Sequence, residues 1–143
     1  MKELEIAKVL MSTVDVLGDI EKSEEFDVYD YSNAVAIIEI KGRHNDKRFP
    51  DALIEEGKYL RLLDECGEKH CLYVMNSGRN IYVFDIKKLT EEGYDFGFKD
   101  RGGMPKTTFW SNQMITKSCG YINWDKAMRI LKWDTENKEY RLR

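Results

Sequence analysis

The sequence predicts one α/β domain built around a mixed β-sheet. Over roughly the first two thirds of the chain, segments with helical spacing of apolar residues alternate with β-rich segments, in the order helix, two strands, helix, two strands. No internal repeat, low-complexity segment or linker divides the 143 residues, a common length for one domain. We therefore expect a single domain over 1–143, with its core over 1–90 and a C-terminal extension over 91–143.

The composition is typical of a globular protein that folds in water. Hydrophobic residues make up 42% of the chain and charged residues 34%, enough for a core and a solvated surface. No apolar run approaches the roughly 20 residues of a membrane span, and the N-terminal MKELEIAKVL is unlike a signal peptide. We expect a cytoplasmic protein. Cys66, Cys71 and Cys119 lack a CxxC spacing, which predicts reduced thiols rather than a zinc site.

Two helices and a hairpin are predicted in the first half of the chain. Apolar residues recur at helical intervals over 2–17, and Gly18 suits a C-terminal cap. FDVYDY, SN and AVAIIEIKG predict a strand, a turn and a second strand. A second helix is predicted over 49–67, because Pro50 suits its first turn and Gly67 its end.

The second half is less regular. CLYVMNS, GRN and IYVFDI predict a strand, a turn and a strand, and KKLTEEG predicts a brief helical or turn segment. Within a glycine-rich region, TTFWSNQMITKS predicts one strand with a bend. NWDKAMRILKWD predicts a short final helix with Asn123 as its N-cap.

The second hairpin strand ends in a charged pair, Glu39 and Lys41. Side chains two residues apart point to the same face of a strand, and Val35 and Ile37 share this face. The face therefore begins apolar and becomes charged at its C-terminal end, where an open α/β sheet forms a crevice. A solvated surface pair is one interpretation. A divalent cation is the other, and it needs more oxygen ligands than Glu39 alone supplies.

The hairpin register decides which second carboxylate faces Glu39. If Tyr31 pairs with Val35 through a three-residue loop, Asp27 lies directly opposite Glu39, with the Cβ atoms about 5 Å apart. If a two-residue loop connects the strands instead, Asp30 takes the face of Glu39 but lies further along the strand. We favour Asp27 and keep Asp30 as the alternative acid.

Asp27, the hairpin, the IIEIK strand and the predicted helix that follows resemble the PD-(D/E)XK nuclease superfamily, which has the restriction-endonuclease-like fold. The resemblance implies an αβββαβ core. It also implies that Mg²⁺ or Mn²⁺ is held by Asp27, Glu39 and the backbone carbonyl of Ile40. Lys41 would then be the catalytic lysine that orients or activates the attacking water.

The predicted second helix adds two candidate catalytic residues, Glu55 and Lys58. They are three residues apart and therefore share a helix face. The superfamily often places a Glu, Gln or Lys here, facing the active site. Glu55 would steady a second cation or the water, and Lys58 would meet a phosphate. A solvated ion pair is the alternative, and Glu56 is the rival acid.

Three side chains that follow the charged strand are candidate phosphate contacts: Arg43, His44 and Arg48. Further along the chain, Arg101 and Lys117 could extend a basic face, and Trp110 could stack on a base. The net charge of −3 argues against broad coating of nucleic acid. DNA is therefore expected to bind in a narrow basic cleft or across a homodimer that pools two clefts.

Together these residues predict a small magnesium-dependent nuclease that hydrolyses DNA phosphodiester bonds, of a kind found in phages or mobile elements. The alternative is a catalytically inactive restriction-endonuclease-like module that binds nucleic acid or protein. A third hypothesis is an unrelated α/β protein in which Glu39 and Lys41 are merely exposed. The metal site is refuted if Glu39 lies more than about 8 Å from every other carboxylate.

Overall fold

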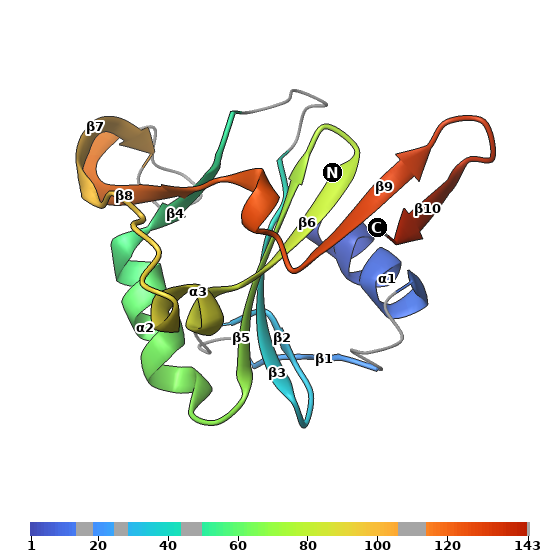
Figure 1. Cartoon of the computed structure of the whole chain (residues 1–143), viewed down its shortest axis with the longest axis horizontal. Helices are drawn as coiled ribbons and strands as arrows, with labels where there is room; N and C mark the ends of the chain where they lie inside the picture. The colour runs from blue at the N-terminus through green and yellow to red at the C-terminus, as the bar shows by residue number, and fades with distance from the viewer. Residues whose placement is uncertain (14–18, 25–28, 44–49, 106–113, 143) are drawn as a thin grey trace.

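The computed structural model describes residues 1–13, 19–24, 29–43, 50–105 and 114–142. Within these ranges the chain forms a mixed α/β domain with a seven-stranded sheet, a three-stranded sheet and three α-helices (Figure 1). The predicted fold class is therefore confirmed. In the same part of the chain, no helix is long and apolar enough to cross a membrane.

The elements follow one another in an order that includes the predicted αβββαβ series. They are α1 (Glu3–Thr13), β1 (Glu21–Lys22), β2 (Tyr31–Ser32), β3 (Ala36–Lys41), β4 (Ala52–Glu55), α2 (Glu56–Cys66), β5 (His70–Ser77), β6 (Asn80–Asp85), α3 (Ile86–Glu91), β7 (Lys99–Pro105), β8 (Met114–Ile122), a 3₁₀ turn (Trp124–Lys126), β9 (Arg129–Asp134) and β10 (Glu139–Leu142). The series is α1, β1, β2, β3, α2 and β5, with β4 added ahead of α2.

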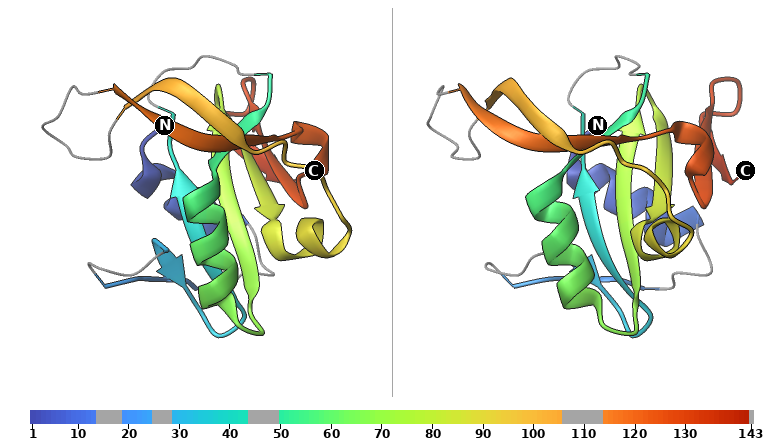
Figure 2. Two further views of the ribbon diagram at one scale, coloured as in Figure 1. Left: turned by 90° about the vertical axis from the view of Figure 1, so that its left-hand side faces the viewer. Right: turned by 60° about the vertical axis from the view of Figure 1, so that its left-hand side comes forward.

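The large sheet has the strand order β1-β2-β3-β5-β6-β9-β10. The central strands β3 and β5 are parallel, because α2 connects them, and the other neighbouring pairs are antiparallel. Both strands are almost entirely buried, as expected for parallel strands covered on two faces. Helix α1 covers one face, whereas α2, α3 and the small sheet cover the other (Figures 1 and 2).

Alternate side chains of β3 enter two separate hydrophobic cores. Ile38 and Ile40 pack in the core that contains Leu10 of α1. Ile37 packs in the core that contains Leu62 of α2. Because strand side chains alternate between faces, residue 39 points towards α2.

The β2–β3 register differs from both predicted registers. Tyr31 pairs with Ile38, and not with either predicted partner. The N–H of Asp30, the residue before β2, donates to the carbonyl of Ile38 at 2.9 Å, so Asp30 lies across the hairpin beside Ile38 and the neighbouring Glu39. The alternative acid is therefore the one that lies across the hairpin from the charged strand.

The side chain of Asn33 explains this register. Its Oδ1 accepts hydrogen bonds from the backbone N–H groups of Val35 and Ala36, each at 2.9 Å. The N–H of Asn33 donates to the carbonyl of Ala36 at 3.0 Å. Asparagine commonly stabilises turns by bonding to the backbone two residues on. The turn is therefore centred on 34–35, two residues beyond the predicted SN turn.

The predicted helix over 49–67 is wrong in its first part. Ala52–Glu55 form β4, which pairs antiparallel with β8, and α2 begins only at Glu56. The strand forms because β8 satisfies its backbone groups and because Ala52 and Ile54 both point into the core. The predicted end of the helix is confirmed: Gly67 follows it with φ +56°.

The predicted final helix is also wrong. Asn123 caps as predicted, accepting a hydrogen bond from the N–H of Asp125 at 3.1 Å, but only a 3₁₀ turn follows. Residues 129–134 form β9 instead, because they pair with both β6 and β10.

The remaining predicted elements have mixed outcomes. Strands β5 and β6 and helix α3 are confirmed. Helix α1 is present up to Thr13, whereas Gly18 lies outside the described residues. The end of TTFWSNQMITKS belongs to β8, and its part within 106–113 lies outside them as well. The three cysteines are buried and free.

Candidate active site

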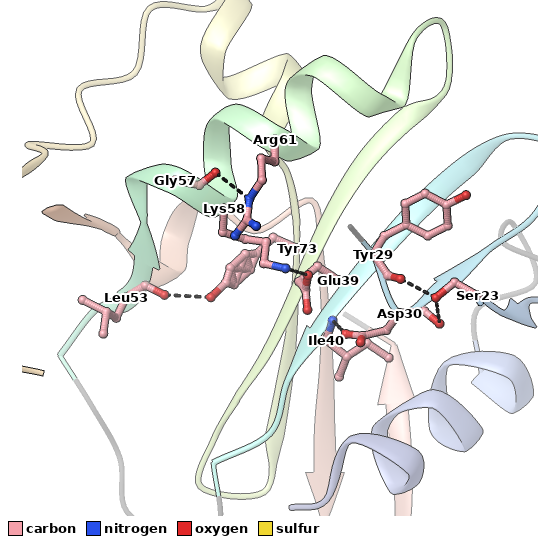
Figure 3. A network of polar contacts seen from close by, with 10 residues as sticks. All are labelled: Ser23, Tyr29, Asp30, Glu39, Ile40, Leu53, Gly57, Lys58, Arg61 and Tyr73. Carbon is pink, nitrogen blue, oxygen red and sulfur yellow. Dashed lines mark hydrogen bonds and ion pairs between the residues drawn. The ribbon is translucent and has the colours of Figure 1, made fainter. Parts of the chain in front are cut away.

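Glu39 is a buried carboxylate in the centre of the large sheet, beneath α2 (Figure 3). The residue is only 3% exposed, because β2 and β5 flank its strand and α2 covers its face. Burying a charged group in this way is costly unless it has partners of its own.

Two charged side chains contact Glu39. Lys58 of α2 places its Nζ 2.8 Å from Oε2 of Glu39. The carboxyl of Asp30 lies within hydrogen-bonding reach of the Glu39 carboxyl. Another carboxylate therefore lies next to Glu39, so the isolation of Glu39 that would refute a cation site is not observed.

Asp30 is itself held in place by backbone and side-chain contacts. Its Oδ2 accepts a hydrogen bond from the N–H of Ile40 at 2.8 Å. Ser23, which follows β1, donates to the carbonyl of Asp30 through both its N–H at 2.9 Å and its Oγ at 3.1 Å (Figure 3). The two acids are thus fixed relative to each other before any ligand arrives.

The surroundings of Glu39 favour its neutral form. Burial raises the pKa of Glu39 to about 7, the neighbouring Asp30 adds to the rise, and Lys58 opposes it. Two adjacent carboxyls repel each other when both are ionised, unless positive charge lies between or beside them. The pair is therefore suited to hold either one shared proton or a cation.

A pocket of about 190 Å³ opens beside Lys58 and Tyr73, the neighbours of Glu39 on α2 and β5, although neither Glu39 nor Asp30 lines it. Its lining includes three basic residues, Lys41, Arg43 and Lys58, and one acid, Glu55. Lys41 thus faces the same side of the sheet as Glu39, as their spacing predicts. With more positive than negative side chains, the pocket suits an anionic group such as a phosphate.

Tyr73 is a site residue that is not among those predicted from the sequence. It lies directly beside Glu39, as its partner on β5, and it lines the pocket. Its hydroxyl donates to the carbonyl of Leu53 at 2.9 Å. Burial, followed by the nearby Glu39, raises the pKa of Tyr73 far above its usual value, so the hydroxyl stays protonated. Only the β3–β5 pairing could have revealed this position.

Glu55 and Lys58 do not pair with each other, and the prediction that they share a helix face is wrong. Glu55 is the last residue of β4, and its Oε1 lies 3.0 Å from Nζ of Lys117 on β8. Both residues nevertheless line the pocket. The rival acid Glu56 accepts a hydrogen bond from Ser118 Oγ at 3.1 Å and does not line it.

The chain that follows Lys41 is fixed by Asn76 of β5, a buried amide. Its Oδ1 accepts from the N–H of Arg43 at 2.6 Å, and its Nδ2 donates to the carbonyl of Gly78 at 2.8 Å. The amino group of Met1 donates to the carbonyl of Arg43. These contacts hold the end of β3, and with it Lys41, at the edge of the pocket.

Three predicted site residues, Asp27, His44 and Arg48, lie outside the described residues. The backbone carbonyl of Ile40 stays a predicted ligand.

The acidic pair fits magnesium or manganese better than a cation that takes most of its ligands from the protein. Among the described side chains, no three His, Cys, Asp or Glu groups converge on one point. Magnesium is usually held by one or two carboxylates and keeps several of its water ligands, whereas calcium takes about six to eight oxygens. Asp30 and Glu39 supply two carboxylates and therefore suit magnesium better than calcium.

Comparisons with protein-family models, with curated proteins and with solved structures find no match to this chain. Membership of the PD-(D/E)XK superfamily therefore stays a prediction, supported by the IIEIK strand, the acidic pair and the order of the elements.

Proposed function

We propose that this protein is a metal-dependent nuclease that hydrolyses DNA phosphodiester bonds. One observation carries the proposal: the carboxyls of Asp30 and Glu39 lie within hydrogen-bonding reach of each other, and Lys41, on the Glu39 face of β3, lines the nearby pocket. The order of α1, the large-sheet strands β1, β2 and β3, α2 and β5 supports it as well, with β4 belonging to the small sheet.

Asp30 and Glu39 are the residues that would hold Mg²⁺ or Mn²⁺. When bound, such an ion neutralises charge on the phosphoryl transition state and lowers the pKa of a coordinated water. The N–H of Ile40 keeps Asp30 in position for this, because it donates to Oδ2. The raised pKa of Glu39 means that cation binding would release a proton near neutral pH.

Lys41 and Lys58 have separate roles in this proposal. Lys41 lines the pocket together with Lys58, the partner of Glu39, so its ammonium can hold the attacking water or a phosphate oxygen there. Lys58 contacts Glu39 directly at 2.8 Å and balances its charge in the absence of substrate. Glu55, paired with Lys117, supports the pocket wall rather than the reacting groups.

A cleavage assay tests the proposal. Linear, nicked and branched DNAs are incubated with Mg²⁺, with Mn²⁺ or with EDTA. We expect cleavage of at least one substrate, dependent on the metal. Asp30→Ala, Glu39→Ala and Lys41→Ala should each reduce the rate roughly a hundredfold or more, since each removes a group that stabilises the transition state.

Two exposed residues supply matched controls for this assay, Asp64 of α2 and Lys132 of β9. Asp64→Ala and Lys132→Ala should leave the rate unchanged. If wild-type protein cleaves no DNA with either metal, or if all three site variants cleave at the wild-type rate, the proposal is wrong.

The second candidate is a catalytically inactive module of the same fold that binds nucleic acid or protein. The contact between Lys58 and the nearly buried Glu39 favours it, because a protein ammonium already neutralises this carboxylate. An inactive module would bind DNA equally well with and without metal, and would cleave none of the substrates.

A further inference from the structure

One face of the small sheet, which we call the outer face, is continuous with the wall of the pocket. On β4, Leu53 and Glu55 line the pocket, whereas the two alternate residues point into the core. Directly opposed residues on neighbouring strands point to the same face of a sheet. The partners of Leu53 and Glu55 on β8, and their partners on β7, therefore lie on the face that includes the pocket wall. Leu53 is opposite Tyr121, Glu55 is opposite Cys119, and Cys119 in turn is opposite Lys99 of β7.

Two more basic residues share this face. Lys117 precedes Cys119 by two residues on β8, and Arg101 of β7 is opposite Lys117. The residues that define the outer face are Leu53, Glu55, Lys99, Arg101, Lys117, Cys119 and Tyr121. The small sheet that carries them lies beside the start of α2 and the ends of β3 and β5 (Figure 2).

Arg101 and Tyr121 form a stacked pair on the outer face. The guanidinium carbon of Arg101 lies 4.6 Å from the centre of the Tyr121 ring. Nε of Arg101 donates to the carbonyl of Cys119 at 3.2 Å, which holds the guanidinium along the sheet. Tyr121 is nevertheless 38% exposed, a large fraction for an aromatic side chain. A planar cation and an exposed ring are therefore presented together.

The charge of the outer face is positive. Its acid, Glu55, is already paired with Lys117 at 3.0 Å, so Lys99 and Arg101 determine the sign. The inner face is covered: a Cβ at Gly120 would lie 2.5 Å from the carbonyl oxygen of Phe96. A ligand of the small sheet would thus meet the basic, aromatic side that leads into the pocket.

We propose that the outer face binds an unpaired nucleic-acid strand, with a base stacked at Tyr121 and Arg101 and the phosphates near Lys99 and the pocket. Aromatic rings and arginine planes stack on any exposed base, and basic side chains follow the backbone. A duplex hides its base faces, so it cannot use this pair. The proposal rests on the proposed function, because it identifies the strand that would lead to Glu39 and Lys41.

Fluorescence anisotropy in EDTA tests the proposal without cleavage. The probes are labelled oligothymidylate, labelled oligouridylate and a duplex of the same length. Wild-type protein should bind at least one single strand more tightly than the duplex, and the two single strands distinguish DNA from RNA. Tyr121→Leu and Arg101→Gln should each weaken that binding about tenfold, since each removes a stacking partner.

Two further variants keep the result interpretable. Tyr121→Phe keeps the ring and should bind like wild type, which separates stacking from misfolding. Arg141→Gln removes an equal charge from exposed β10 and should have no effect on binding. The proposal is overturned if Tyr121→Leu and Arg101→Gln both bind like wild type, or if wild-type protein prefers the duplex or binds no probe.

The two proposals fail in different ways. Single-strand binding that depends on Tyr121 and Arg101, without cleavage of any DNA, would keep this inference and refute the nuclease. Metal-dependent cleavage, together with binding that neither substitution weakens, would support the nuclease and refute this inference.

Discussion

Glu39 can be neutralised by three different partners: a proton, the ammonium of Lys58 and a divalent cation. Burial and Asp30 raise the pKa of Glu39 to about 7, so the proton is gained or lost near neutral pH. Lys58 is within 2.8 Å. Because these partners compete for one carboxylate, the protonation of Glu39 shows most directly which of them occupies the site.

The stability of the protein should fall as the pH rises through neutrality, because of Glu39. Its folded-state pKa, about 7, lies above the ordinary 4.5, so the folded state retains a proton that the unfolded state has lost. This stabilisation is complete below pH 4.5 and is lost as the pH passes 7. Glu39→Gln should remove a dependence on the order of a few kcal/mol.

Urea denaturation in EDTA, at a series of pH values between about 5 and 8, checks this prediction. The free energy of unfolding of wild type should decline over the series relative to that of Glu39→Gln. Parallel curves for the two proteins would show that Glu39 titrates normally.

Replacing Lys58 by methionine should shift this decline further up the pH scale. The ammonium lowers the pKa of Glu39, so its removal leaves burial and Asp30 unopposed. The same denaturation series measures the shift, with the exposed Lys132→Met as its control. A midpoint that stays in place would mean that the Lys58–Glu39 contact does not persist in solution.

At the scale of elements, the site is assembled by pairings between strands. The shared face of Glu39 and Lys41 could be predicted from their two-residue spacing on one strand, but the choice of Asp30 as the acid beside Glu39 could not. Its position depends on a turn that the side chain of Asn33 shifts by two residues. Glu55 was misplaced on a helix because the partner strand of β4 lies more than 60 residues away in sequence.

Asn76 should be essential for the end of β3. Asn76→Ala leaves the N–H of Arg43 and the carbonyl of Gly78 without this buried partner, which should cost about 2 kcal/mol or more. Asn137→Ala is the control, because this exposed amide bonds only locally to Asp134 and should cost far less. Urea denaturation of the two variants compares them; equal losses would refute a special role for Asn76.

At the scale of the whole molecule, the C-terminal extension is part of the site rather than an appendage to it. Strands β7 and β8 complete the small sheet with β4, and Lys117 of β8 reaches Glu55 at the pocket. Sequence patterns within 91–143 could not show this, because the small sheet joins segments that are distant in the chain. Local apolar patterns in the first part, by contrast, predict the helices α1 and α2 and the strands β3, β5 and β6, although they show neither β1 nor β4.

The docking of the small sheet should depend on Gly120. A Cβ there would lie 2.5 Å from the carbonyl oxygen of Phe96 and 2.9 Å from the ring of Phe98. Gly120→Ala should therefore destabilise the protein by about 1–3 kcal/mol. Gly102→Ala on β7 is the matched control, because no atom lies within 4 Å of its Cβ position. Thermal unfolding distinguishes the two variants, and similar melting temperatures would contradict the close packing of Phe96 and Phe98 against Gly120.

Manganese binding by isothermal titration calorimetry is the most direct test of the acidic pair as a metal site. Wild-type protein should bind Mn²⁺, Asp30→Asn and Glu39→Gln should each abolish this binding, and the exposed Asp64→Asn should keep it. Wild-type protein that binds no Mn²⁺, or binding that survives in both Asp30→Asn and Glu39→Gln, would contradict a metal site at the acidic pair.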